Sequence, residues 1–184
     1  HLPEQFGGVR PVSAVAPGVL ATTGMESLEL VRGAVRHVRP ACVLAVDALA
    51  AAAPERLCRT FQLSDAGIVP GSGVGNHRWA LDQKTLGVPV FSSGIPTVVD
   101  AATIVSDTMS NLIQAMSQSV PLKNLGSSLH SLNESEKQDL IRELLSPSLN
   151  TMFVTPKDID ESIKRLSFTV SEGLNIALGA AAVC

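Results

Sequence analysis

Hydrophobic residues gather along the chain in short continuous runs, separated by longer stretches in which they are regularly spaced. The continuous runs are rich in β-branched residues, which is typical of strands buried in a parallel sheet. They occupy residues 11–19, 43–46 and 88–91, and a shorter strand is expected at residues 61–63. Pro89 interrupts the third run, which favours an early or edge position for that strand because proline donates no hydrogen bond.

In the spaced stretches, apolar residues recur every three or four positions, as on one face of a helix. The expected helices cover residues 28–38, 99–116 and 156–179, and a further helix follows residues 133–136, carries its apolar stripe at residues 140–145 and ends before Pro147. Two shorter helices are expected at residues 54–59, after an alanine-rich stretch, and within residues 79–86. Residues 117–131 are rich in serine, asparagine and glycine, so we expect a long surface connection there.

Polar residues that cap helices mark where three of these helices begin. The cap signals are Thr23 with Glu26, Asn133 with Glu136, and Thr155 with Pro156 at the first helical position. Asp158, Asp160 and Glu161 then complement the positive end of the last helix dipole. The spacing therefore predicts where these helices start as well as where they lie.

The order of these elements predicts an α/β fold with three layers, α/β/α, and a mostly parallel sheet. The strand at residues 11–19, the helix at 28–38 and the strand at 43–46 form a strand–helix–strand unit, whose two strands are expected to run parallel. A chain of 184 residues suits one domain with a sizeable core. We therefore expect residues 1–184 to form a single α/β domain.

Composition narrows the class of protein. The chain is 45% hydrophobic and 17% charged, which is typical of a globular protein. Its net charge is −3 and it has no cluster of lysine and arginine, so we expect no direct contact with nucleic acid. No apolar run approaches the ~18 residues of a membrane span, and no leader is evident. The three cysteines form no CxxC pair, which indicates reduced thiols in a cytosol-like compartment.

Asp47 is the first candidate for chemistry. It follows the apolar run at residues 43–46 directly, and open α/β sheets keep their active sites at the carboxyl ends of their strands. The alternative is that Asp47 caps the alanine-rich helix expected after it. A single carboxylate does not hydrolyse a peptide unaided, because acid–base hydrolysis needs a partner in the other protonation state.

A glycine-rich turn at residues 64–78, SDAGIVPGSGVGNHR, is the second candidate, and we expect it to face the same crevice as Asp47. Its glycine spacing fits neither a phosphate-binding loop, nor a dinucleotide fingerprint, nor a nucleophile elbow. It is either a tight structural loop or a backbone surface that binds a substrate chain or an oxyanion. The candidate substrate-binding residues are Gly71, Ser72, Gly73, Gly75, Asn76 and His77.

The other histidines and carboxylates give weaker signals. His1, His37 and His130 are scattered and form no pair at i, i+4, so we expect no dedicated metal site. Asp100 and Asp107 lie on or near the start of a predicted helix, where they complement the helix dipole.

Eight long motifs, spread in order over nearly the whole chain, carry a family resemblance. They are LPEQ, PVSAVAPGVLATTG, VLAVDALAA, QLSDAGIVPGSGVGN, TLGVPV, GIPTVVDAATIVSDT, VTPKDID and EGLNIAL. In these motifs the chain resembles the spore germination proteases. The resemblance implies an endopeptidase of endospore-forming bacteria that degrades small acid-soluble spore proteins during germination.

The same resemblance implies a fold similar to that of the hydrogenase maturation proteases, which is phosphorylase/hydrolase-like. It also implies a zymogen that processes its own amino-terminal piece, a homotetramer, and a place in the cytoplasm of the spore core. We expect no cofactor and no metal. The partners that the resemblance implies are the protein substrate and further copies of the chain.

Catalysis in this family is implied to be of an atypical aspartic type, with two aspartates on different strand ends. The VLAVDALA motif places one of them on Asp47. The other lies upstream of His1, so we expect the chain to be the carboxy-terminal part of a longer protease that lacks its first strand. Asp47 and the second aspartate would share a proton and activate water, residues 71–75 would line the cleft, and Asn76 or His77 would polarise the scissile carbonyl.

Two other functions stay open on the sequence. The chain could be a non-catalytic α/β binding or assembly module, in which Asp47 accepts hydrogen bonds from helix amides. It could also be a metal-dependent hydrolase with Asp47 and His77 as ligands, although two ligands are too few to define a site.

Overall fold

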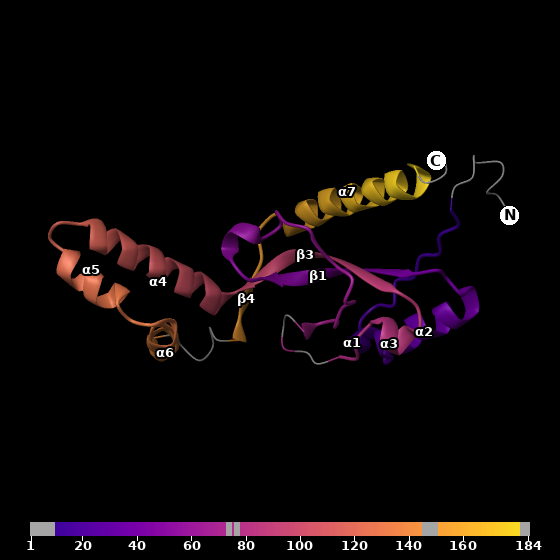
Figure 1. Ribbon diagram of the computed structural model, residues 1–184, viewed down its shortest axis with the longest axis horizontal. Coiled ribbons are helices and arrows are strands. Elements are labelled where there is room, and N and C mark those ends of the chain that lie inside the picture. The colour runs from indigo at the N-terminus through magenta and orange to yellow at the C-terminus, as the bar shows by residue number, and fades with distance from the viewer. Residues whose placement is uncertain (1–9, 73–74, 76–77, 145–150, 181–184) are drawn as a thin grey trace. The chain divides into compact units, whose positions relative to one another are not determined.

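The computed structural model describes residues 10–72, 75, 78–144 and 151–180, which form a mixed α/β fold (Figure 1). The elements in chain order are α1 (Leu20–Thr23), α2 (Ser27–Val38), β1 (Val43–Ala51), η1 (Pro54–Arg56), β2 (Gln62–Ser64), α3 (Gln83–Leu86), β3 (Val90–Asp100), α4 (Ala101–Gln118), α5 (Lys123–His130), α6 (Glu134–Leu144), β4 (Phe153–Val154) and α7 (Ile159–Ala180). Contacts group the described residues into two compact units. The first lies within residues 1–47, 61–94 and 158–184, and the second within residues 48–60 and 95–157.

The sheet has the strand order β1-β3-β2, and β4 also pairs with β3. β3 pairs antiparallel with β2, where Leu63 is opposite Ser93, and antiparallel with β4, where Val99 is opposite Val154. Among the strands that the structure describes, β1 and β3 form the one parallel pair. The prediction of a mostly parallel sheet is therefore wrong. It rested on a strand–helix–strand unit expected before Asp47, whereas β2 and β4 both pair antiparallel with β3.

The first strand of that predicted unit is not present, because residues 10–19 have no regular structure ahead of α1. Val12, Val15 and Val19 are more than half exposed, at 66%, 53% and 62%. β-branched composition describes a residue that fits a paired, half-buried surface, and this run pairs with no described strand. The helix predicted at residues 28–38 is confirmed as α2, which buries Leu28 and Val35.

The capping box predicted ahead of α2 is also wrong. Glu26 occupies the N-cap position of α2, but its side chain makes no capping hydrogen bond. Thr23 instead ends α1, and its hydroxyl oxygen accepts a hydrogen bond from the backbone N–H of Met25 at 3.2 Å. The two side chains with the right spacing belong to different helices, so they cannot close one box.

β1 begins at Val43 as predicted but continues through Ala51. Residues along it alternate between half-buried and exposed, and Leu44 and Val46 are 41% and 54% exposed, so β1 is not a fully buried strand. The alanines expected to form a helix extend the strand instead, because pairing with β3 overrides their helix propensity. Pro54 begins the short 3₁₀ helix η1, as its first-turn preference predicts.

β3 is the central strand, so of the two positions that Pro89 favoured, edge or early, the edge position is wrong. Pro89 precedes it, and a different proline, Pro96, lies within it and is almost fully buried. Pairing of β3 with β2 ends at Gly94 and pairing with β4 begins at Val99, so Pro96 falls between the two antiparallel partners. Its carbonyl oxygen accepts a 2.7 Å hydrogen bond from the backbone N–H of Cys58. The prolines thus avoid the ladder positions where an N–H is needed.

In the second unit, α4 and α5 pack together and α6 contacts α4 (Figure 1). The surface connection predicted at residues 117–131 is wrong, since α5 lies within it. Gly126 explains the error: a Cβ there would come within 2.3 Å of the backbone N of Ser117, so the glycine permits close helix packing. Asn133 and Glu136 form the predicted reciprocal cap of α6, at 2.9 and 2.8 Å.

The predicted starts of α4 and α7 differ in how far the structure confirms them. Asp100 caps α4, because its carboxylate accepts a 2.7 Å hydrogen bond from the backbone N–H of Ala102. Thr155 does not cap α7: its hydroxyl donates to the carbonyl oxygen of Thr97 in β3, and α7 begins at Ile159. Acidic residues fill the first turn of α7, as predicted. Among the described helices, none combines the length and apolarity needed to cross a bilayer.

Candidate functional site

Asp47 lies in the middle of β1 and not at its carboxyl end, which corrects the predicted position. It is half-buried and shares its face of the strand with Ala45 and Leu49, whereas the neighbours Val46 and Ala48 are exposed. The alanine-rich helix that Asp47 was to cap does not form. The residue is therefore a carboxylate on the more buried face of an extended strand.

β1 ends the strand order among the described strands, so one of its hydrogen-bonding edges pairs with β3 and the other with no strand of the described residues. An edge of this kind presents backbone N–H and C=O groups to whatever lies beside it. Asp47 is thus carried by a strand that can accept a further parallel or antiparallel neighbour on that side.

The base of the glycine-rich loop is firmly closed. Ile68 and Leu81 form an antiparallel bridge with two backbone hydrogen bonds of 3.0 and 2.8 Å. The hydroxyl of the buried Ser92 in β3 donates to the carbonyl oxygen of Gly67 at 3.0 Å. Gly67 has φ +78°, and a Cβ there would lie 2.1 Å from the carbonyl oxygen of Leu81, so only glycine fits this position.

The described part of the loop tip consists of tight turns. Gly71 and Gly75 have φ values of 73° and 76°. The backbone N–H of Ser72 donates to Val69, and that of Gly75 donates to Ser72, both at 3.2 Å. The predicted site residues Gly73, Asn76 and His77 lie outside the described residues. That the loop tip faces Asp47 therefore stays a prediction.

The sequence patterns did not indicate the contact that holds the far end of the loop. The guanidinium of Arg78 donates a 3.1 Å hydrogen bond to the carboxylate of Glu26, and the two residues are 52 positions apart in the sequence. Both side chains are about three-quarters buried, at 29% and 26% exposed. The capping spacing around Glu26 concealed this role, and no short-range pattern signals a pair at such separation.

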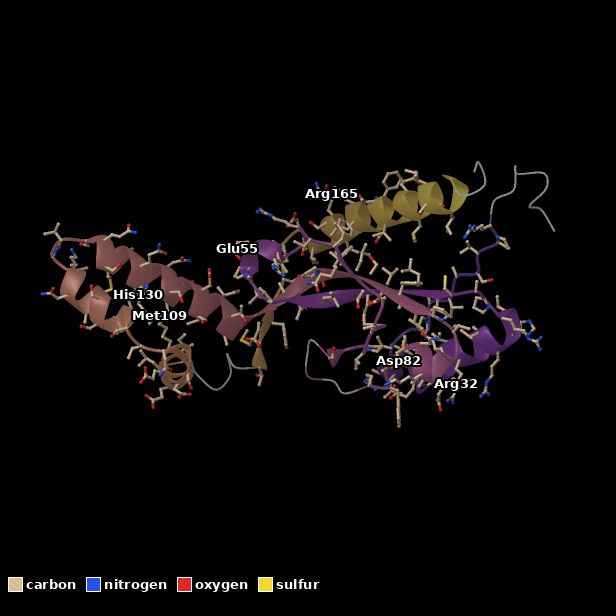
Figure 2. All side chains as sticks on the ribbon, viewed as in Figure 1. Arg32, Glu55, Asp82, Met109, His130 and Arg165 are labelled. Carbon is tan, nitrogen blue, oxygen red and sulfur yellow. The ribbon has the colours of Figure 1, made fainter. Side chains whose placement is uncertain are left out.

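Downstream of the loop, Asp82, which Figure 2 labels, caps α3 in a complete capping box with Thr85. The backbone N–H of Thr85 donates to the Asp82 carboxylate at 2.8 Å, and this bond is the largest of the effects that hold the pKa of Asp82 below its ordinary value. The box fixes the start of the short helix predicted within residues 79–86, which is confirmed as α3.

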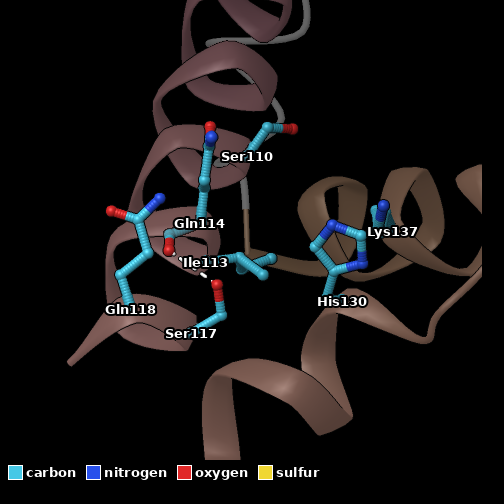
Figure 3. A pocket seen from close by; sticks show the side chains of 7 residues that line it. All are labelled: Ser110, Ile113, Gln114, Ser117, Gln118, His130 and Lys137. Carbon is cyan, nitrogen blue, oxygen red and sulfur yellow. Dashed lines mark hydrogen bonds between the residues drawn. The ribbon is translucent and has the colours of Figure 1, made fainter. Parts of the chain in front are cut away.

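The second unit contains a polar pocket of about 500 Å³ (Figure 3). It is lined by Ser110, Ile113, Gln114, Ser117, Gln118, His130 and Lys137. Ile113 is buried, and the Ser117 hydroxyl donates to the Gln114 carbonyl at 2.7 Å. These lining residues include no carboxylate and none of the predicted site residues. The pocket is therefore not the place for hydrolysis by aspartate.

The carboxylates and histidines of the described residues form no evident metal centre. In that part of the chain, no group of three or more histidine, cysteine and acidic side chains is arranged to hold a metal ion. Of the predicted aspartates outside the loop, Asp107 accepts a 3.3 Å hydrogen bond from the side-chain amide of Asn111 on the exposed surface of α4, which is a local helical contact.

Comparison with known proteins identifies the family. A profile of the germination proteases matches residues 2–130 and 123–182. The germination protease of Caldanaerobacter subterraneus subsp. tengcongensis is 46% identical over 180 residues, covering 97% of this chain and 56% of that protein. That of Clostridium acetobutylicum is 47% identical over 180 residues, with 97% and 55% covered, and that of Bacillus subtilis 41% over 202 residues, with 93% and 55% covered. The chain spans about half the length of the curated relatives it matches, and on these matches it belongs to the germination protease family.

Proposed function

We propose that this chain supplies Asp47 as one of two catalytic aspartates of an endopeptidase that degrades small acid-soluble spore proteins during germination. Membership of the germination protease family supports the peptidase activity. The observation that carries the assignment of Asp47 is its place on β1, half-buried and beside a strand edge that no described strand occupies. A carboxylate that activates water needs both partial shelter from solvent and access to a neighbour.

The proposed reaction is hydrolysis by a carboxylate pair. Two like-charged carboxylates in one site share a proton, so one is ionised and the other is neutral. The ionised group takes a proton from water as the water oxygen forms a bond to the scissile carbonyl carbon. The neutral group gives its proton to the amide nitrogen as the C–N bond breaks. After one turnover the two carboxylates have exchanged roles.

The second aspartate is proposed to come from the part of the protein that its relatives have and this chain does not cover. The relatives are nearly twice as long as the matched region. A strand from that part could pair with the open edge of β1 and bring its own aspartate beside Asp47. The chain would then be the carboxy-terminal part of one α/β domain similar to that of the hydrogenase maturation proteases.

The glycine-rich loop is proposed to line the cleft. Residues 71–75 would approach the substrate backbone closely, since a glycine has no Cβ to keep another chain away. Asn76 or His77 would polarise the scissile carbonyl by donating a hydrogen bond to the oxygen as it gains negative charge. The proposal also includes the zymogen, the homotetramer and the spore-core location that the resemblance implies.

The test is cleavage of a purified small acid-soluble spore protein by the full-length protein carrying Asp47→Asn. We expect turnover to fall about 10²- to 10⁴-fold, the usual effect of removing a general acid or base, with the melting temperature nearly unchanged. Asp107→Asn is the matched control, because its carboxylate makes only a helical surface contact, and it should keep wild-type turnover. A folded Asp47→Asn protein with near-normal turnover would remove Asp47 from the mechanism.

A further inference from the structure

The ion pair between Arg78 and Glu26 joins the end of the glycine-rich loop to the start of α2. Its donor–acceptor distance is 3.1 Å, and its partners are 29% and 26% exposed. For comparison, Arg165 on α7 (Figure 2) forms ion pairs with Asp158 at 3.9 Å and with Glu161 at 4.0 Å. The side chains of these pairs are at least 64% exposed. A short, charge-assisted hydrogen bond with partial shelter from water holds its geometry better than those exposed pairs do.

Glu26 is itself held in place by α2. It occupies the N-cap position, and its carbonyl oxygen accepts hydrogen bonds from the backbone N–H groups of Glu29 at 3.0 Å and Leu30 at 3.4 Å. Its carboxylate makes no capping bond and reaches Arg78 instead. Negative charge beside a helix N-terminus is also favourable. Glu26 therefore acts as a fixed anchor.

A second attachment runs beside the ion pair. Leu28, two residues after Glu26, and Leu81, three residues after Arg78, belong to the same buried cluster with Leu86 and Val90. The segment that follows the loop tip, residues 78–81, is thus held against α2 by an ion pair and by an apolar contact. The segment that precedes the loop tip is held to β3 by the hydrogen bond from the Ser92 hydroxyl to the Gly67 carbonyl oxygen.

We propose that Glu26 and Arg78 are a positioning pair for the glycine-rich loop. Arg78 holds residues 78–81 at the end of the loop against α2, and it does so through its contact with Glu26 and not by binding the substrate. This inference rests on the proposed function only in assigning the loop to the cleft. The pair itself is a property of this chain, so it can be tested without any activity.

The first test is hydrogen exchange at residues 69–80 in wild type and in Glu26→Gln and Arg78→Gln. We expect both variants to exchange about tenfold faster there, because each removes a charge-assisted hydrogen bond, with no change in α4 or α5. Arg165→Gln is the control. It removes exposed ion pairs on α7, so residues 69–80 should exchange in this variant at the wild-type rate. Unchanged exchange at residues 69–80 in both variants would overturn the proposal.

The second test is kinetic and uses the full-length protein. Glu26→Gln should raise KM about tenfold with kcat within about twofold, as expected when substrate binding weakens and chemistry does not. The exchanged pair Glu26→Arg with Arg78→Glu should recover most of the loss. A large defect in Arg78→Gln with none in Glu26→Gln, unrescued by the exchange, would mean that Arg78 binds substrate and would overturn the positioning role. If the wild-type protein cleaves no substrate, the proposed function fails, and hydrogen exchange still decides the pair.

Discussion

β1 and β3 are neighbours in one sheet and are both apolar in sequence, yet most residues of β3 are buried and most residues of β1 are not. Val90 and Val99 of β3 are 2% and 1% exposed, whereas Leu44 and Val46 of β1 are 41% and 54% exposed. β3 has a partner on each side, and β1 has one among the described strands. Apolar composition therefore indicates that a segment can be a strand, but its partners decide how deeply it is buried.

The same difference bears on the position of Asp47 in the middle of β1. An ionised carboxylate in the middle of β3 would be stripped of water on both sides, at a cost of several kcal/mol unless it were paired. On β1, Asp47 is only half-buried. An edge strand can therefore hold a carboxylate at a lower cost of desolvation than a fully buried strand can.

The largest expected loss of stability is at the base of the loop that β3 supports. Gly67→Ala should lower the free energy of unfolding by about 3 kcal/mol or more, because the new Cβ would meet the Leu81 carbonyl at 2.1 Å while φ stays positive. Gly75→Ala is the control, with a similar φ of 76° but no atom within 4 Å of the new Cβ, and should cost about 1 kcal/mol. Urea unfolding measures both, and equal losses would show that the contact with Leu81 does not matter.

A second pair of substitutions, with smaller expected losses of stability, compares β1 and β3 directly. Val99→Ala in β3 should lower the free energy of unfolding by about 2 kcal/mol, since it removes two methyl groups from a fully buried site. Val46→Ala in β1 makes the same chemical change on an exposed face and should cost no more than about 0.5 kcal/mol. If the denaturation curves of the two variants have the same midpoint, the difference in burial between Val99 and Val46 does not affect the free energy of unfolding.

Much of the fold could be predicted from local patterns. The spacing of apolar residues located α2, α4, α6 and α7, and the Asn133–Glu136 cap was correct, because a helix depends on contacts within a few residues. The error at α5 came from its serines and Gly126. Composition there predicts a loop, whereas close packing on α4 is what makes the glycine useful.

The strands were harder, because their pairing involves distant residues. Residues 11–19 have strand-like composition but no described partner, and the alanines after Asp47 form a strand only because β3 lies beside them. For the site, the sequence indicated Asp47 and the glycine-rich loop as candidates. The contact between Glu26 and Arg78 could not be found from the sequence, since nothing local relates residues 52 positions apart.

The central claim is that Asp47 works with a second carboxylate brought to the open edge of β1. The most direct measurement is a crystal structure of the full-length protein. We predict a further strand paired with β1 on the side away from β3, carrying an aspartate whose carboxylate lies about 3 Å from that of Asp47, as in sites where two carboxylates share a proton. An Asp47 with no other carboxylate near it, beside an edge covered by a helix or left in solvent, would contradict the account.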